Sequence, residues 1–444
     1  MSFEFSGNHI SENKKESQPL DEQWYKRFEK NGKFQVYELL NGDKEWRENQ
    51  KNDFLNQKIE NPKLDYPELE NFDFNKKEEE LLTLKVDVLK FENNEIVKQI
   101  YRWKINEKIA SVRMLRCSKE GDSHRFKRYS EYVFGKPEKE IFLQSLIKVK
   151  HVIDGKRSDS DQRIIEAIAR LDQNINIPEE IETSIDINSY DFPKLKSTKN
   201  EPEYSAEEIK VAFQRALLEC NAQGWSVVLD ESGNTAINVN QENKTVYVLA
   251  KRKVKETKLK ALIAHEIGTH ALRRENGERS KLKLLGLGLD RYLKGEEGLA
   301  RYKEQEIIGA TDFAGFDGHL AISLAMGLDG KKRDFREVFD ILRDYYFVKS
   351  KNANRDESWK NAEELAWKRC LRAFRGTTCD IPGACFTQDI AYREGNIGIW
   401  NLVKKDDDEM RRVMVGKYDP TSERHIWILD QLGISDSDLE TLAN

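Results

Sequence analysis

The sequence predicts an α+β fold that is helical over most of its length and has one small sheet. Apolar residues recur at helical spacing through long, charged segments in both halves of the chain. Three short β-rich runs at 225–229, 235–239 and 245–250 are separated by turn residues, which predicts an antiparallel meander. An apolar segment with two histidines, 256–274, follows the meander, and we refer to it as the motif helix.

We expect three regions along the 444 residues. Residues 1–55 form a polar to amphipathic extension, disordered over about the first 20 residues, where few apolar side chains occur. Residues 56–195 form a mostly helical N-terminal region, and residues 196–444 form the domain that contains the motif helix. Ser205 and Glu208 have the spacing of a capping box at the first helix of that domain. Asn276-Gly277 is expected to end the motif helix, and 413–415 to form another strand.

Composition excludes several classes of protein. Lys and Arg number 74 and Asp and Glu 79, so a net charge of −5 gives no overall attraction to nucleic acid or anionic membranes. No apolar run has the length of a membrane span, and the N-terminus lacks the apolar core of a signal peptide. The five cysteines are scattered and odd in number, so we expect free thiols. A cytoplasmic protein without nucleic-acid or membrane partners is predicted.

The motif helix contains the residue types of a hydrolytic zinc site. Imidazole nitrogens of His265 and His270 are suitable Zn²⁺ ligands, and the Glu266 carboxylate can accept a proton from a metal-bound water. The histidines are five residues apart rather than four, and at about 100° per residue their rings would diverge by about 140° on a regular helix. One π-type turn would return both rings to one face, and Gly268 would ease that distortion. The alternative is a regular helix with one buried and one exposed histidine.

A third ligand is expected downstream, where Glu296 and Glu297 precede Gly-Leu-Ala. Zinc hydrolases often combine two histidines with a glutamate from a following helix, and a water completes the coordination. Neighbouring side chains on a helix point about 100° apart, so one of the two acids would face the metal. The residues alone do not decide which one.

Together these residues resemble the microtubule-associated tyrosine carboxypeptidase family, whose bacterial relatives carry a QEGLA motif. The resemblance is carried by HEIGTHALR from His265 and EEGLA from Glu296, with further similarity at 61–66, 132–137, 373–395 and 410–419. It extends over about residues 55–432, and the insert 377–384 departs from the family pattern. The resemblance implies that His265, His270 and Glu297 bind zinc.

The resemblance also implies that Glu266 is the catalytic base and that the chain is a zinc metallo-carboxypeptidase. The expected reaction removes a C-terminal residue, tyrosine-like aromatic or acidic, from a peptide or protein tail. Tubulin is a possible substrate through the resemblance alone. A meander that leads into a metal-binding helix fits a zincin-like domain, in which an edge strand lines the substrate cleft.

A carboxypeptidase needs a group that binds the terminal carboxylate, and a bidentate arginine is suited to this. Arg375 is the first candidate. Arg273 and its neighbour Arg274 are weaker candidates, because they also suit the C-terminal end of the motif helix. Tyr392 could stabilise the oxyanion of the tetrahedral intermediate, or it could be a core residue.

Two other functions remain open from the sequence. A zinc hydrolase of a small amide or ester would have a deep, closed pocket instead of an open groove beside an edge strand. A non-catalytic regulatory or binding protein with structural zinc would supply four protein ligands. Glu266 beside the first histidine argues against the second of these functions, because a structural site does not need a base.

Overall fold

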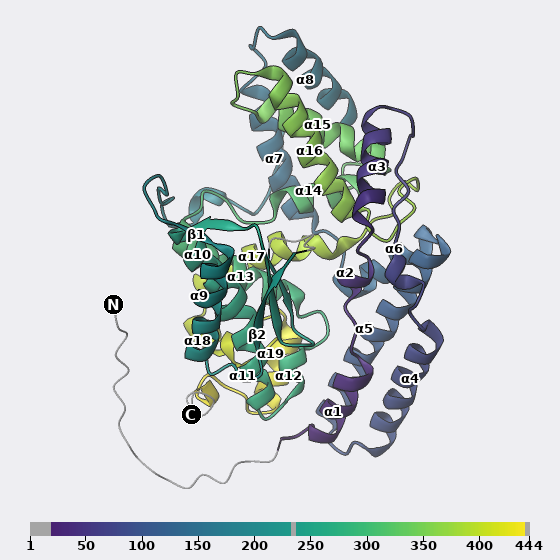
Figure 1. Cartoon of the computed structure of the whole chain (residues 1–444), viewed down its shortest axis with the longest axis vertical. Coiled ribbons are helices and arrows are strands. Elements are labelled where there is room, and N and C mark those ends of the chain that lie inside the picture. Colours follow the sequence, from purple (N-terminus) through teal and green to yellow (C-terminus); the bar gives the residue numbers. More distant parts are fainter. Residues whose placement is uncertain (1–18, 232–236, 440–444) are drawn as a thin grey trace.

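The computed structural model describes residues 19–231 and 237–439, and most of them are helical. Figure 1 shows one group of helices at the top, a second group at the lower right and a third group with the sheets at the lower left. Helix α17 (Ile390–Val403) crosses the middle between the upper and lower-left groups (Figure 1). The α+β class is confirmed, whereas the tail expected to be disordered lies almost wholly outside the described residues. Within the described ranges, none of the helices combines the length and apolar character of a membrane span.

The first half of the chain supplies the helices of the lower-right group and part of the upper group (Figure 1). They are α1 (Glu22–Asn31), α2 (Val36–Leu39), α3 (Lys44–Leu55), α4 (Phe74–Phe91), α5 (Glu95–Glu120), α6 (Ser123–Phe134), α7 (Lys139–Asp154) and α8 (Gln162–Asn174). Two single 3₁₀ turns, Pro67–Leu69 and Ile187–Ser189, lie in the connections.

The second half begins with five short strands and the helix between the first two of them. These elements are β1 (Glu203–Ser205), α9 (Ala206–Glu219), β2 (Ser226–Asp230), β3 (Ile237–Asn240), β4 (Thr245–Leu249) and β5 (Lys253–Lys255). The later elements are α10 (Glu256–Leu262), η3 (Ile263–Ala271), α11 (Leu272–Arg279), α12 (Leu284–Leu287), α13 (Leu293–Ile308), α14 (Phe316–Met326), α15 (Phe335–Lys349), α16 (Arg355–Ala373), η4 (Thr387–Asp389), α17, α18 (Asp407–Arg412), η5 (Val413–Val415) and α19 (Glu423–Gln431). The predicted capping box is present at α9, where Ser205 N donates to Glu208 Oε2 at 2.8 Å.

Two large apolar cores join residues from distant parts of the chain. In one core Phe54 of α3 packs against Phe335 of α15, with ring centroids 5.2 Å apart. In the other, Phe28 of α1 belongs to the same buried cluster as Leu285 and Tyr418. Burial of such side chains from both ends of the chain ties the helices of the first 55 residues to the body of the protein. The predicted region boundaries at 55 and 195 stay a prediction.

The strand order corrects the predicted meander. The three-stranded sheet has the order β2-β4-β3, in which β3 and β4 are antiparallel but β2 and β4 are parallel. Strand β4 has the most buried side chains, with Val246 and Val248 fully enclosed, so it takes the central place. Because β3 occupies one edge of β4, β2 must join the other edge. Strand β1 pairs with β5 in a separate antiparallel ribbon.

Two further predictions about local structure were wrong. Residues 413–415 form a 3₁₀ turn instead of a strand, because the carbonyls of Val413 and Met414 accept hydrogen bonds from side chains of α11. The motif helix does not end at Asn276-Gly277 but continues to Arg279. A Cβ at Gly277 would overlap the backbone of α12, so this glycine permits close packing and does not terminate the helix.

Helices α13 and α17 pack backbone against backbone through two glycines. A Cβ at Gly298 would overlap the backbone of Gly395, and a Cβ at Gly395 would overlap the carbonyl of Lys294. The two glycines come from separate sequence landmarks, EEGLA and YREG. Their contact determines the position of the acidic pair of α13 relative to α17.

We predict that Gly298→Ala and Gly395→Ala each lower the free energy of unfolding by at least about 2 kcal/mol, because a methyl group has no space between the helices. Gly268→Ala is the matched control. Its Cβ would lie 3.7 Å from the nearest atom, and a change within about 0.5 kcal/mol is expected. Urea unfolding of the three variants checks the prediction, and equal losses for all three would contradict it.

Candidate metal centre

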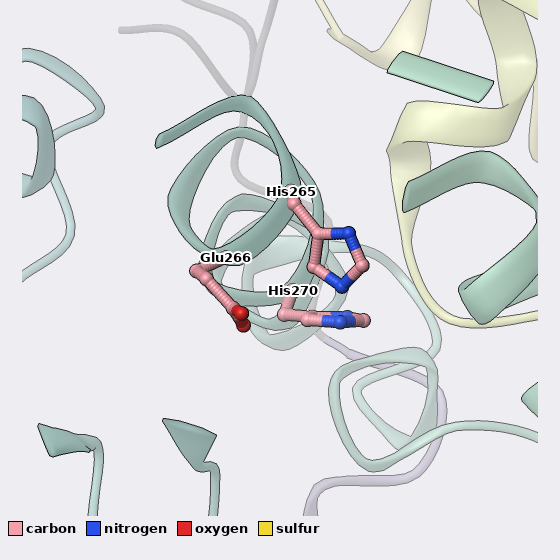
Figure 2. A group of neighbouring side chains, drawn as sticks. All are labelled: His265, Glu266 and His270. Carbon is pink, nitrogen blue, oxygen red and sulfur yellow. The ribbon is translucent and has the colours of Figure 1, made fainter. Parts of the chain in front are cut away.

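The motif helix is interrupted by a π-helix, η3, between α10 and α11. The wider turn places His265 and His270 on the same side, with ring centroids 5.0 Å apart and ring planes at 80°. Figure 2 shows both imidazoles projecting from one side of the helix, with the Glu266 carboxylate beside His270. Both histidines are buried, at 7% and 6% exposure. The predicted π-type turn is confirmed, and the alternative with one exposed histidine is wrong.

Side chains stabilise the π-helix through its backbone carbonyls. Thr269 Oγ1 donates to Ala264 O at 2.9 Å, and Lys303 Nζ of α13 donates to Gly268 O at 2.7 Å. Burial, together with the positive charge of Arg273, lowers the pKa of Lys303 to about 8. A Cβ at position 268 would have ordinary contact distances, so sterics do not require a glycine there.

His265, Glu266 and His270 form a group of potential metal ligands. One ligand atom from each residue lies within 4.8 Å of the others, and no other group of three or more such residues is found in the part of the chain that the structure describes. Imidazole nitrogens and a carboxylate oxygen are donors that Zn²⁺ accepts, so the chemistry of this set fits zinc. A π-helix that places such donors together is consistent with the frequent occurrence of π-bulges at functional sites.

Each histidine turns its Nδ1 atom toward a carboxylate of α13. His270 Nδ1 is hydrogen-bonded to Glu296 Oε1 at 2.8 Å. His265 Nδ1 lies 3.4 Å from Glu304 Oε2, close enough for an ion pair but without hydrogen-bond geometry. Carboxylates in this position orient metal-binding histidines and increase their basicity. Nε2 is therefore the available ligand atom on each ring.

Glu296 belongs to a buried charge network. Its carboxylate is 1% exposed and lies 2.6 Å from Arg273 Nη1 and 3.0 Å from Lys417 Nζ. Burial raises the pKa of Glu296, but the positive charges of Lys417 and Arg273 outweigh burial and hold it well below its usual value. In turn, burial lowers the pKa of His270, while the hydrogen bond and charge of Glu296 raise it overall. Glu296 is therefore an ionised group that orients His270.

Arg273, a candidate for substrate binding, is fully buried inside this network. Its Nε donates to Val413 O and Gly416 O at 2.9 and 2.8 Å, and its Nη2 donates to Tyr418 O at 2.8 Å. These contacts join α11 to the C-terminal segment. Because the guanidinium is occupied by protein groups, Arg273 is suited to positioning Glu296.

Glu297, the third ligand implied by the resemblance, is half-buried and lies outside the group of three. Its negative charge still contributes to raising the pKa of His270, which places it in the neighbourhood of the site. Since Arg273, Lys417 and His270 Nδ1 hold Glu296, Glu297 is the acid of the pair whose carboxylate remains available. The geometry thus favours Glu297 over Glu296, and its role as a ligand stays a prediction.

The structure brings Tyr392 to the site but not Arg375. Burial and the charge of Glu297 raise the pKa of Tyr392, whose ring lies beneath the guanidinium of Arg301 at 5.3 Å. Arg375 instead packs on Tyr37, 3.7 Å from the ring centroid, and its Nη1 donates to Tyr37 O and Asn41 Oδ1. These contacts connect Arg375 to the first region of the chain.

Sequence reasoning missed three charged residues around the histidines: Lys303, Glu304 and Lys417. The sequence did contain a signal for Glu304, because Glu297, Arg301 and Glu304 have the i, i+4, i+7 spacing of one helical face. Lys417 carried no such signal, since 120 residues separate it from Glu297 and the two meet only through the fold.

We predict stability effects of very different size for the two neighbouring acids of α13. Glu296→Gln is expected to lower the free energy of unfolding by about 3–5 kcal/mol, because it leaves Arg273 and Lys417 buried without an anion. Glu297→Gln should change it by less than about 1 kcal/mol, as expected for a half-buried residue outside that network. Denaturant unfolding measures both, and similar losses for the two variants would refute the distinction.

Two comparisons relate this chain to known proteins. Mouse microtubule-associated tyrosine carboxypeptidase 1 is 29% identical over 150 residues, which cover 32% of this chain and 27% of the mouse protein. The alignment therefore spans about a quarter of that relative's length. The family model described as microtubule-associated tyrosine carboxypeptidase matches residues 181–437, more than half of the chain, and includes the π-helix, α13 and α17. The chain belongs to the microtubule-associated tyrosine carboxypeptidase family.

Proposed function

We propose that this protein is a zinc-dependent carboxypeptidase that removes one residue from the C-terminus of a peptide or protein tail. The observation that carries the proposal is the π-helix, which gathers His265, His270 and Glu266 into one group. Family membership supports the carboxypeptidase reaction. The mouse relative's name indicates tyrosine as the residue removed, and tubulin tails are one candidate substrate.

The metal would be held by Nε2 of His265, Nε2 of His270 and the carboxylate of Glu297. Bound Zn²⁺ would lower the pKa of a water molecule and polarise the scissile carbonyl. Glu266 lies beside His270 (Figure 2) and would accept the proton from the attacking water, then transfer it to the leaving amine. Tyr392 is the candidate for stabilising the oxyanion, because it lies close enough to Glu297 for the charge of that carboxylate to contribute to raising its pKa. From the group of His265, Glu266 and His270 in the π-helix we also infer a zincin-like domain.

A basic cleft suggests where the tail would lie. The cleft has a volume of about 600 Å³ and reaches from α1 to Tyr292 at the start of α13, and Val239 of β3 also lines it. Seven of its lining residues are basic (Lys26, Lys30, Lys33, Lys104, Lys108, Arg274 and Arg291) and three are acidic (Glu29, Glu107 and Glu242). This excess of positive charge favours an acidic tail. Because β3 is an edge strand of its sheet, an extended peptide could pair with it.

The same observations weigh against the two alternatives. The cleft spans several elements and is lined in part by the edge strand β3, which fits a peptide groove better than the deep, closed pocket expected for a hydrolase of a small amide or ester. A structural zinc site would have four protein ligands, whereas the group found in the described residues has three members, one of which suits a base.

We predict that Glu266→Gln abolishes trimming but keeps the metal. Wild type and variant are each assayed for bound zinc by mass spectrometry and incubated with peptides of varied C-termini. We expect about one zinc in both and loss of single C-terminal residues with the wild type alone, because the variant cannot accept the proton. Zinc in both proteins without any trimming would favour the small-molecule hydrolase. Wild type that holds no zinc after reconstitution would refute the site.

A second prediction concerns the basic cleft. Lys30→Glu combined with Lys33→Glu is expected to lower kcat/KM for an acidic tail at least tenfold at low salt, mainly by raising KM. The introduced glutamates would repel the negative charges of the tail. Lys368→Glu, on an exposed position of α16 outside the cleft, is the matched control. Equal kcat/KM for the cleft variant and the control would contradict this path of the substrate.

A further inference from the structure

We propose that a pocket between α13, α14, α16 and α17, here called the arginine pocket, binds the carboxylate of the substrate's C-terminal residue. Three arginines (Arg301, Arg369 and Arg372) and Tyr392 line it, together with the two acids Asp317 and Asp389. The inference rests on the proposed function, which requires a terminal carboxylate to be recognised. It assigns this role to arginines that the sequence did not indicate, in place of Arg375.

The size and lining of the pocket suit one amino-acid residue. Its volume is about 390 Å³, within the range of pockets that enclose small ligands. Residues 314–318, which include the start of α14, form another part of the lining. Gly315 is the N-cap of this helix and provides no side-chain cap, so the first N–H groups lack that partner. Their partial positive charge adds to that of the arginines.

Arg369 is the arginine with donors left for a ligand. Arg372 is bound bidentately by Asp389, with Nε and Nη2 each 2.6 Å from a carboxylate oxygen. Arg301 Nη1 pairs with Glu304 at 2.7 Å. The nearest carboxylate oxygens to Arg369, on Asp389 and Asp317, lie 3.7 and 3.9 Å away, beyond hydrogen-bond distance. An incoming carboxylate would therefore gain a bidentate partner without displacing a strong internal bond.

The pocket adjoins the candidate metal centre through α13. Glu297 and Arg301 are one helical turn apart on the same face. Burial lowers the pKa of Arg301, but nearby charges, chiefly that of Glu304, outweigh burial and raise it overall. Burial is the main cause of the raised pKa of Tyr392. The charge of Glu297 contributes to raising the pKa of both groups, which places both near Glu297. A residue bound at Arg369 would thus lie on the side of the site where Glu297 and Tyr392 meet.

The test measures binding directly and separately from catalysis. Zinc-loaded wild type, Arg369→Gln and Arg369→Lys are titrated by NMR with N-acetyl-tyrosine and with its C-terminal amide. Wild type should prefer the acid at least tenfold, Arg369→Gln should lose this preference, and Arg369→Lys should keep part of it, because lysine retains the charge but not the bidentate geometry. Arg215→Gln, on an exposed position of α9, is the control and should match the wild type.

The outcomes distinguish the pocket from the proposed function. Arg369 is partly exposed and its two ion pairs are long, at 3.7 and 3.9 Å, so its variants should fold, which circular dichroism verifies. If the wild type trims peptides while Arg369→Gln and Arg369→Lys keep the full acid preference, the arginine pocket is wrong and the proposed function stands. If the wild type prefers the acid and loses this preference only in the Arg369 variants, but trims no peptide, the pocket stands and the proposed function falls.

Discussion

The site depends on the interactions that the buried carboxylate of Glu296 makes with its neighbours. It joins three parts of the chain, because it contacts His270 in the π-helix, Arg273 in α11 and Lys417 in the C-terminal segment. A single buried carboxylate would be costly, but two cations and an imidazole hydrogen bond compensate for its desolvation. Removal of the Glu296 carboxylate would leave Arg273 and Lys417 in the interior without an anion. The network therefore couples the orientation of His270 to the folding of residues 413–418.

Helix α13 organises the remaining parts of the site. Its acids face both histidines, and Lys303 holds a carbonyl of the π-helix. Gly298 lets α17 approach closely, so Tyr392 reaches the neighbourhood of Glu297. One helix thus supports the wider turn and orients the rings. Such support is relevant because π-helices are rare and occur mostly as single turns within α-helices.

The sequence was informative where local periodicity determines the structure. The residue types of the two histidines and Glu266 indicated a shared metal site, and their five-residue spacing meant that such a site needed a π-type turn, which the structure contains. The parallel pairing of β2 with β4 was not predictable, because it depends on which edge of β4 remained free. Lys417 and Arg369 were also missed, since charged residues in isolation are typical of solvated surfaces and acquire a partner only when distant segments meet.

Helical geometry explains how the proposed sites could cooperate in removing one residue. Tyr292 at the start of α13 lines the basic cleft, and Arg301 lines the arginine pocket, with Glu297 between them. At 1.5 Å per residue, Glu297 and Arg301 are about 6 Å apart along the axis. An extended peptide advances about 3.3–3.6 Å per residue, so this interval holds one or two residues. A tail that enters from the cleft and anchors its carboxylate at the arginines would therefore present a bond next to its C-terminus to Glu266 and the proposed zinc site.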